Sequence, residues 1–270
     1  MSGQGKAVKI GAEIRSELEK KNIAFTLFTT KWPHVFFGFT EIWLVGGDGT
    51  INYFLNHYKD NALPLVFFKG GTGNDIAWKL YGEISLEQHI DLALNAIARP
   101  IDAAMCNDNI FINSSGIGFD GEVLKSIGTI RWLGGHLGYL SVVLKKIFTF
   151  KEFDFTIEVP GEKYTGKFLL VIANNSSRTG GGFMVTPNAS VNDGKLDLLL
   201  CKPLSIWQRL RYLPVIEKGN HLNLPFIIYS QVTDIHIEGE KTMYAQLDGE
   251  LIKSRVFAIK IFPGKVLVKY

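Results

Sequence analysis

The sequence predicts two domains, an α/β domain over residues 1–98 and a mostly antiparallel, β-rich domain over residues 99–270. Three observations support this fold class. The chain of 270 residues exceeds the usual size of a single hydrophobic core. Its first third alternates between helical and strand patterns, as parallel sheets with crossover helices do. After about Arg99, strand patterns dominate, which favours an antiparallel sheet.

The first domain is expected to begin with a helix. Over residues 7–21, apolar residues recur at the spacing of an amphipathic helix. Short apolar runs at 41–45 and 64–68 follow, and each run ends in glycines and leads into a helix-compatible segment. This order predicts a parallel sheet, and ligands bind at the carboxyl ends of such strands.

The second domain is expected to combine strands with two helices. Strand patterns occupy residues 109–113, 153–159, 168–174, 195–200 and 226–238. Helical patterns persist at 131–150 and 205–216. The most apolar helical segment, 137–150, is interrupted by Lys145 and Lys146. Burial against another domain is the favoured explanation for this segment, and docking on a membrane is the alternative.

The overall composition excludes several classes of protein. A net charge of +3 from 29 basic and 26 acidic residues is too balanced to indicate nucleic-acid binding. The two cysteines, Cys106 and Cys201, form no CxxC pair, so neither a disulfide framework nor a zinc site is expected. The N-terminus lacks the pattern of a signal peptide, and no apolar run reaches roughly 18 residues. We therefore expect a cytoplasmic protein whose membrane contact, if any, is peripheral.

Two glycine-rich motifs follow the first two predicted strands. The first, Gly46-Gly47-Asp48-Gly49-Thr50, precedes the helix-compatible residues 51–57. Glycines allow backbone N–H groups to approach phosphate oxygens, although a plain turn with Asp48 as the helix N-cap is an equal alternative. The second, Gly70-Gly71-Thr72-Gly73-Asn74-Asp75, again opens a helix-like segment. Two such loops at neighbouring strand ends indicate one nucleotide site.

Two acidic turns lie further along the chain. The first, Asp193-Gly194-Lys195-Leu196-Asp197, places two carboxylates around a turn, as a hard cation requires. The second, Asp248-Gly249-Glu250, could supply a general base and a metal ligand. On these residues alone, an ordinary turn into a strand and an ordinary hairpin turn are the favoured explanations.

Other nucleotide and hydrolase motifs are absent from the sequence. The six histidines show no HExxH spacing, and no Gly-x-Ser-x-Gly motif is present. Neither a P-loop nor the His-Arg-Asp loop of protein kinases occurs. A nucleotide must therefore bind on a different scaffold.

The order of the motifs resembles that of the diacylglycerol kinase catalytic family, which is related to the sphingosine kinases. The motifs that carry this resemblance span nearly the whole chain and occupy residues 46–50, 71–75, 116–120, 180–182, 187–189, 193–197 and 248–250. The resemblance implies a nucleotide-binding α/β domain, like that of NAD kinases and phosphofructokinases, joined to a β-sandwich domain. The active site would lie in the cleft between them.

The resemblance also implies an activity, the magnesium-dependent transfer of the ATP γ-phosphate to a lipid hydroxyl of the diacylglycerol or sphingoid type. The membrane lipid would be the protein's main partner. Residues implied to hold the nucleotide are Gly47, Asp48, Gly49, Thr50, Thr72, Asn74 and Asp75. Asp248 would be the general base, and Glu250, with Asp48, would position the catalytic Mg²⁺. Asp193, the Lys195 carbonyl and Asp197 resemble a structural magnesium site.

The sequence departs from the family pattern at its beginning. Members usually start with a β-strand that leads into an Asn-Pro-x-Ser-Gly turn, whereas residues 2–7 resemble only the end of that motif. The first strand is therefore expected to be missing, and an exposed sheet edge would favour a homodimer.

Two other functions remain as alternatives to a lipid kinase. An NAD kinase shares the first glycine motif but would carry a different second motif. A non-catalytic regulator that binds nucleotide or lipid is the other alternative, and the presence of Asp48, Asp75, Asp248 and Glu250 argues against it. Diacylglycerol, a sphingoid base, ceramide and phosphatidylglycerol all fit as acceptors.

Overall fold

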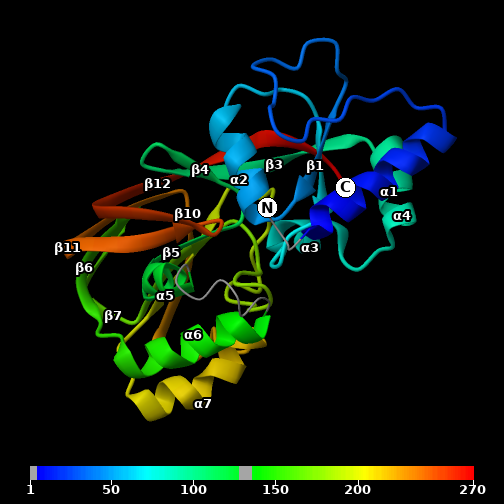
Figure 1. Cartoon of the computed structure of the whole chain (residues 1–270). Helices are drawn as coiled ribbons and strands as arrows, with labels where there is room; N and C mark the ends of the chain where they lie inside the picture. The colour runs from blue at the N-terminus through cyan, green and yellow to red at the C-terminus, as the bar shows by residue number, and fades with distance from the viewer. Residues whose placement is uncertain (1–4, 128–135) are drawn as a thin grey trace.

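The computed structural model describes residues 5–127 and 136–270 (Figure 1). It confirms the predicted combination of an α/β part and a largely antiparallel β-rich part. Residues 2–4 of the N-terminal motif and the first five residues of the predicted helix 131–150 lie outside the described ranges. The helix itself is present from His136 onward.

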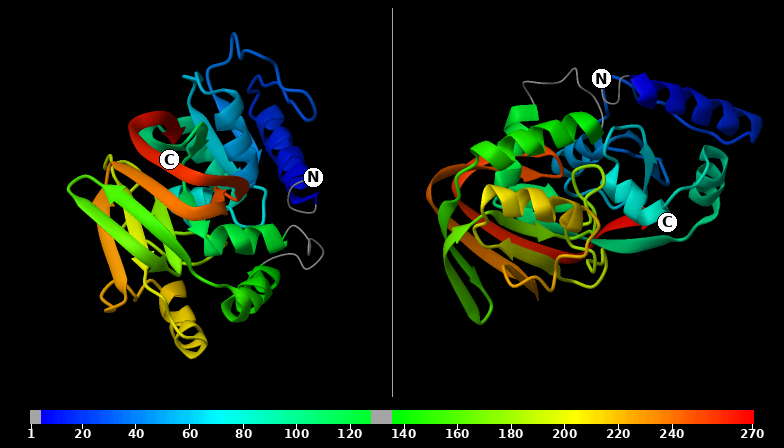
Figure 2. Two further views of the ribbon diagram at one scale, coloured as in Figure 1. Left: turned by 90° about the vertical axis from the view of Figure 1, so that its left-hand side faces the viewer. Right: turned by 90° about the horizontal axis from the view of Figure 1, so that it is seen from below.

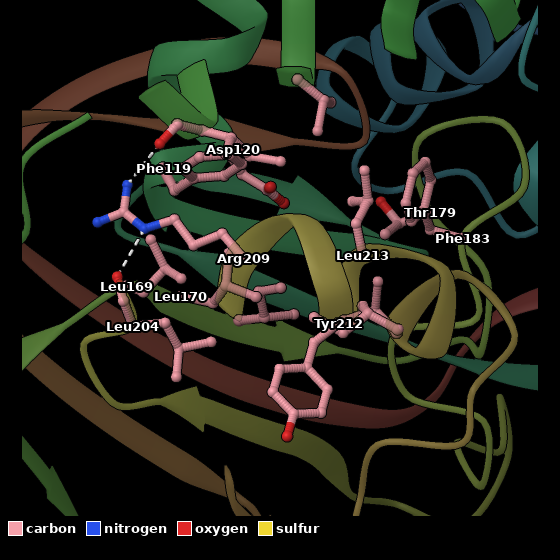
Figure 3. Close-up of a pocket in the computed structure, with 15 residues that line it drawn as sticks. Phe119, Asp120, Leu169, Leu170, Thr179, Phe183, Leu204, Arg209, Tyr212 and Leu213 are labelled. Carbon is pink, nitrogen blue, oxygen red and sulfur yellow. Dashed lines mark hydrogen bonds between the residues drawn. The ribbon is translucent and has the colours of Figure 1, made fainter. Parts of the chain in front are cut away.

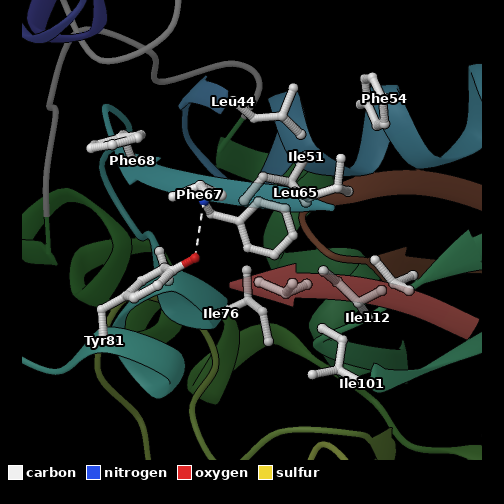
Figure 4. Close-up of a cluster of buried hydrophobic side chains, with 14 of the residues drawn as sticks. Leu44, Ile51, Phe54, Leu65, Phe67, Phe68, Ile76, Tyr81, Ile101 and Ile112 are labelled. Carbon is white, nitrogen blue, oxygen red and sulfur yellow. Dashed lines mark hydrogen bonds between the residues drawn. The ribbon is translucent and has the colours of Figure 1, made fainter. Parts of the chain in front are cut away.

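The N-terminal part alternates helices and parallel strands. Its elements are α1 (Lys6–Lys20), β1 (Ile42–Gly46), α2 (Asp48–His57), β2 (Leu65–Lys69), α3 (Asp75–Tyr81) and α4 (Leu86–Asn95). Strands β1 and β2 are parallel neighbours, with Ile42 opposite Leu65. Their side chains pack against the helices in a core that includes Phe54 and Phe67 (Figure 4). The buried Tyr81 hydroxyl accepts a hydrogen bond from the Phe67 N–H, 3.1 Å long.

The C-terminal part is built mainly of antiparallel strands. Its strands are β3 (Ala98–Cys106), β4 (Asn109–Phe111), β5 (Ser114–Gly118), β6 (Phe153–Val159), β7 (Glu162–Phe168), β8 (Leu170–Asn174), β9 (Leu196–Cys201), β10 (Ile227–Val232), β11 (Asp234–Leu247) and β12 (Glu250–Lys269). Its helices are α5 (Phe119–Ile127), α6 (His136–Thr149) and α7 (Ile206–Glu217). These helices gather on one side of the curved sheet (Figures 1 and 2).

The predicted strand 226–238 is two strands in the structure, because the chain changes its neighbours at Thr233. Before this residue, β10 pairs with β9, and after it β11 pairs with β12, β5 and β6. The Thr233 carbonyl accepts a hydrogen bond from the Ile261 N–H at the change of neighbour. A continuous run of strand-forming residues gave no sign of this switch.

The last strand, β12, joins the two parts of the molecule. Its first half pairs with β11, and its second half pairs with β3 and reaches β2, where Val268 lies opposite Leu65. Val266 and Val268 belong to the same hydrophobic cluster as the β1 and β2 side chains. The boundary between residues 98 and 99 stays a prediction, but the C-terminal residues pack into the N-terminal core.

The N-terminal edge of the sheet is open. No strand precedes α1 in the described residues, and the order of the sheet begins at β1, which pairs with β2. Residues 23–30 form no strand, and the side chains of Ile23, Phe25 and Leu27 are exposed. Among the described helices, none has the length and apolar character that a membrane crossing demands.

Candidate active site

The two glycine motifs meet because β1 and β2 are parallel neighbours. The Gly70 N–H donates a 2.7 Å hydrogen bond to the Gly46 carbonyl. Gly47 and Gly71 pack directly against each other, since a Cβ on Gly71 would lie only 2.3 Å from the Gly47 Cα. Side chains at these two positions would force the loops apart, so the close contact of the motifs requires glycine.

Asn74 shapes the second loop. Its backbone is in the left-handed region, with φ of 54°. Its side-chain oxygen accepts the Gly71 N–H at 2.8 Å, and its amide donates to the Gly71 carbonyl at 2.9 Å. The loop is thus closed on itself by the Asn74 side chain, while the neighbouring Thr72 is exposed.

Helix α2 begins at Asp48, three residues earlier than the predicted segment 51–57. Gly49 and Thr50 therefore belong to its first turn, and the Thr50 side chain folds back over Gly46. The N-terminus of a helix carries unpaired N–H groups and a partial positive charge, which together favour an anion such as a phosphate.

The carboxylates of Asp48, Asp75 and Asp248 lie close enough beside the glycine loops to influence one another's pKa. A Cβ on Gly73 would lie 2.9 Å from Asp48 Oδ2 and 3.5 Å from Asp75 Oδ2. Burial, reinforced by the charges of Asp75 and Asp248, raises the pKa of Asp48 to about 7. Burial also raises the pKa of Asp75 and brings that of Asp248 to about 6. Such a cluster is poised to bind a cation, which would offset the repulsion.

Asp248 lies in the tight turn between β11 and β12. The turn is the hairpin that the Asp-Gly pair favours, and it also brings the carboxylate to the candidate site. Its φ is 49°, and its carboxylate points inward. Oδ2 accepts the Ile112 N–H at 2.8 Å, and Oδ1 accepts the Asn113 and Ser114 N–H groups at 2.9 Å each. Asn52 of α2 adds a side-chain hydrogen bond. These donors fix the carboxylate and favour its charged form.

Glu250 approaches the first glycine loop from the same hairpin. A Cβ on Gly49 would lie 3.0 Å from Glu250 Oε1, so this side chain reaches the first turn of α2. Partial burial raises the pKa of its carboxyl. The structure therefore brings together Asp48, Asp75, Asp248 and Glu250, which are separated by up to about 200 residues in the sequence.

Arg178 completes the site and was missed by the sequence analysis. Its Nε lies 2.9 Å from Asp75 Oδ1, and its guanidinium lies over the Trp78 ring, 4.7 Å from the centroid. The Gly181 N–H donates to Asp75 Oδ2 at 2.9 Å, and Arg178 donates back to the Gly181 carbonyl. Asp75 thus ties the loop around Gly181 to α3. The only available signal was the position of Arg178 just before the Gly180–Gly182 motif.

The acidic turn at residues 193–197 belongs to a different group of contacts. The buried Asp197 accepts a hydrogen bond from the Tyr229 hydroxyl. Burial is the main cause that raises the pKa of Asp197, and the charge of Asp193 adds to it, while Lys79 opposes it. The Lys195 N–H donates to Asp193 Oδ1 at 3.1 Å, which closes the turn.

The carboxylates around Asp48 are suitable ligands for Mg²⁺. Within residues 5–127 and 136–270, no three histidine, cysteine or acidic side chains converge as in a preformed metal centre. Mg²⁺, however, is usually held by one or two carboxylates together with water and substrate phosphates. Asp48 Oδ1 is buried and has no hydrogen-bond partner, although backbone N–H groups of Asn74 and Ile76 bond to its carboxylate. An orphaned, buried carboxylate oxygen is the group that such a cation would bind.

An apolar cavity of about 70 Å³ lies between α5, α6, α7 and the sheet (Figure 3). Most of its lining is aliphatic or aromatic, while Asp120 and Thr179 contribute polar groups. Burial raises the pKa of Asp120 to about 6. The Thr179 hydroxyl is 3.0 Å from the Ser114 hydroxyl, and the Ser114 N–H donates to Asp248. Two hydrogen bonds therefore separate the cavity wall from the acidic cluster.

Comparison with protein families matches both parts of the chain. Residues 1–106 match the model described as diacylglycerol kinase catalytic domain. Residues 113–269 match the model described as YegS C-terminal NAD kinase beta sandwich-like domain.

Individual relatives point in the same direction. A diacylglycerol kinase of Bacillus subtilis is 29% identical over 216 residues, which cover 78% of this chain and 71% of the relative. A protein of Shewanella frigidimarina described as a probable lipid kinase, YegS-like, is 28% identical over 228 residues, 82% of this chain and 73% of the relative.

Solved structures of Bacillus anthracis proteins have a similar fold. One protein described as a candidate diacylglycerol kinase is 27% identical, with a TM-score of 0.69 over 85% of this chain and 76% of that one. A second, at 23% identity, has a TM-score of 0.78 and covers all of this chain and 94% of that one, which supports the fold alone.

Proposed function

This chain belongs to the diacylglycerol kinase catalytic-domain family, with a C-terminal domain of the YegS type, and from that premise we propose that it phosphorylates a membrane lipid. In this reaction the γ-phosphoryl group of ATP passes to a lipid hydroxyl with the help of Mg²⁺. One observation carries the proposal: Asp248 stands at the junction between the glycine loops and the apolar cavity. The predicted family resemblance is confirmed, whereas the donor, metal and acceptor remain proposals.

The nucleotide phosphates would bind at the two glycine loops. Backbone N–H groups of Gly47 and Gly49 lie at or before the first turn of α2, where a helix attracts negative charge. The Thr50 N–H already donates to the Gly47 carbonyl at 2.9 Å, so Thr50 would act by holding this turn in shape. Thr72 stands exposed beside them and can contribute its hydroxyl. Asn74 would act by holding the loop in shape, because its side chain is engaged with Gly71.

Asp48 and Glu250 would hold the catalytic Mg²⁺. When bound, the metal would neutralise charge on the phosphates during transfer. Asp48 brings an unpaired buried oxygen, and Glu250 approaches the same turn of α2 from the β11–β12 hairpin. Asp193, Asp197 and the Lys195 carbonyl remain our proposal for a second, structural magnesium site.

Asp248 would act as the general base. With a pKa of about 6, its carboxyl is mostly ionised at neutral pH, yet it is basic enough to accept a proton in the transition state. The three backbone N–H groups that hold it leave little freedom of orientation. The lipid oxygen would attack the γ-phosphorus, its proton would pass to Asp248, and ADP would leave. Positioning and charge neutralisation can carry such a transfer without a covalent enzyme intermediate.

The apolar cavity would receive part of the lipid. Most of its lining matches hydrocarbon, and its polar groups at Asp120 and Thr179 can orient an oxygen or nitrogen of the headgroup region. Thr179 is connected to Asp248 through Ser114, so the reacting hydroxyl and the base would lie on the same side. A diacylglycerol-type or sphingoid-type acceptor fits this arrangement.

The proposal is tested by transfer of labelled γ-phosphate from ATP with Mg²⁺ to a panel of lipids in mixed micelles, with NAD as a competing acceptor. We expect label on a lipid and its loss in the Asp248→Asn protein. Label on NAD alone would contradict the lipid-kinase proposal. Absence of any transfer by folded, nucleotide-binding protein would instead favour a regulator.

A further inference from the structure

Helices α6 and α7 expose apolar side chains on the faces that point away from the cavity. Trp207 is 81% exposed and Phe148 is 57% exposed, and Leu144 and Ile206 are exposed beside them. We call these four residues the α6–α7 surface. Large apolar side chains grouped on two neighbouring helices are unusual for a surface that faces only water.

The same two helices line the cavity with their opposite faces. Val143 and Ile147 of α6 line the cavity, as does Leu213 of α7, which is labelled in Figure 3. The start of α7 is fixed by a capping box in which Ser205 and Gln208 exchange hydrogen bonds. Trp207 is therefore presented from a well-formed first turn. An object that touches the α6–α7 surface would lie one helix thickness from the cavity.

The exposed charged residues around this surface are all basic. Over 140–151 and 202–218, the exposed charged side chains are Lys145, Lys151, Lys202, Arg211 and Lys218. No aspartate or glutamate is exposed within those two ranges. The acids in or beside these ranges are partly buried: Glu152 forms an ion pair with the buried Arg209, and Glu217 is the last residue of α7.

We propose that the α6–α7 surface docks on an anionic lipid bilayer and brings the cavity to the membrane. The inference rests on the proposed function for its purpose, because a lipid acceptor must be collected from a membrane, but docking itself needs no turnover. Tryptophan and phenylalanine insert at the headgroup level, and the surrounding lysine and arginine side chains attract anionic headgroups. A protein partner would need acidic groups and a complementary shape, whereas a bilayer supplies both the charge and the apolar depth.

A second exposed apolar segment provides the matched control. Phe37 is 93% exposed in the segment between α1 and β1, and Val35 is exposed beside it. Figures 1 and 2 place this blue segment at the opposite end of the molecule from α6 and α7. A flat bilayer cannot touch both ends in one orientation. Phe37→Ser therefore removes an aromatic ring that is more exposed than Trp207 or Phe148 without touching the proposed surface.

The test is co-sedimentation of the full chain with sucrose-loaded vesicles, either phosphatidylcholine alone or phosphatidylcholine with about one third phosphatidylglycerol. We expect at least tenfold stronger partitioning onto the anionic vesicles. Phe148→Ser with Trp207→Ser should lower that partitioning at least tenfold, and Lys145→Glu with Arg211→Glu should do the same. Phe37→Ser should leave it within twofold, and thermal unfolding should show that every variant is folded.

Several results would overturn the docking proposal. Equal binding to neutral and anionic vesicles, unchanged binding of both double variants, or loss of binding in Phe37→Ser would each do so. So would sedimentation analysis in which Phe148→Ser with Trp207→Ser dissolves a dimer and leaves vesicle binding intact. The outcome is separable from that of the kinase assay, because Asp248→Asn should bind vesicles like the wild type. Vesicle binding without lipid phosphorylation would reject the proposed function and keep the docking surface.

Discussion

Replacing Asp248 by asparagine should remove catalysis and leave the protein folded. The substitution keeps the size of the side chain, and asparagine tolerates the left-handed backbone at φ of 49°. The asparagine oxygen can still accept the Asn113 and Ser114 N–H groups that now bond to Oδ1. The new amide nitrogen would face the Ile112 N–H, so the hydrogen bond from Ile112 is lost.

The magnitude follows from these contacts. A buried N–H without a partner costs about 1–3 kcal/mol, and for a chain of this size each kcal/mol lowers Tm by about 2–4 °C. Removing a carboxyl whose pKa is raised by burial offsets part of that cost. Loss of a general base typically lowers kcat by about 10²- to 10⁴-fold. The expected variant is therefore slightly less stable and nearly inactive.

The assay compares initial rates of label transfer at saturating lipid, with Tm and nucleotide affinity measured on the same samples. Asp234→Asn is the matched control, because this carboxylate lies at the start of β11, the strand that leads to Asp248, in an exposed ion pair with Lys260. It should keep its full rate. If Asp248→Asn retained more than a tenth of the wild-type kcat, the carboxylate would be a structural acceptor for the N–H groups of residues 112–114 and not the base.

Three further predictions concern the metal at Asp48, the ion pair between Arg178 and Asp75, and the contact between Gly47 and Gly71. The raised pKa of Asp48, about 7, keeps its proton in the folded state over pH 4–7 while the unfolded chain has lost it, so its contribution to stability falls as pH rises through this window. Mg²⁺ should therefore raise Tm more at pH 8 than at pH 5. Arg178→Ala leaves the buried Asp75 unpaired and should lower the free energy of unfolding by about 3–5 kcal/mol in urea titrations. Gly71→Ala brings a Cβ to 2.3 Å from the Gly47 Cα and should weaken nucleotide binding in calorimetry by tenfold or more.

Each of these predictions has a control and a contrary result. Equal Tm shifts with Mg²⁺ at both pH values would argue against a metal at Asp48. Arg255→Ala breaks an exposed ion pair and should lower the free energy of unfolding by less than about 1 kcal/mol. A loss that small for Arg178→Ala would contradict the stabilising role of its ion pair with Asp75. Gly11→Ala adds a methyl group in open space on α1, and nucleotide affinity equal to that of Gly71→Ala would show that the glycine contact is irrelevant.

Local sequence patterns were sufficient to predict the elements that bear the candidate site. The glycine motifs follow β1 and β2 because short apolar runs that end in glycine have few other structures available, and residues 153–159 were predicted with their observed bounds. The acidic turn at residue 248 is a hairpin, as its Asp-Gly pair indicates. In each of these cases the local structure is determined by residues that are close together in the sequence.

The features that were missed depend on contacts between distant residues. The partners of Asp248 come from residues 112–114, more than 130 positions earlier, and no local pattern indicates them. Arg178 acquires its importance only when the loop around Gly181 folds onto α3. The predicted start of α2 at residue 51 was late because glycine disfavours helices in general, although Gly49 lies in its first turn. Tertiary packing overrides propensity at these positions.

The path of β12 has a consequence for how the protein is made. Val268 completes the sheet beside Leu65, which leaves the ribosome about 200 residues earlier. At roughly 5–20 residues per second, the N-terminal core must wait about 10–40 s for its last strand. Until then β2 lacks that neighbour, and its unpaired edge and apolar residues can associate with other unfolded chains. Newly made chains should therefore depend on chaperones that hold the N-terminal part until synthesis ends.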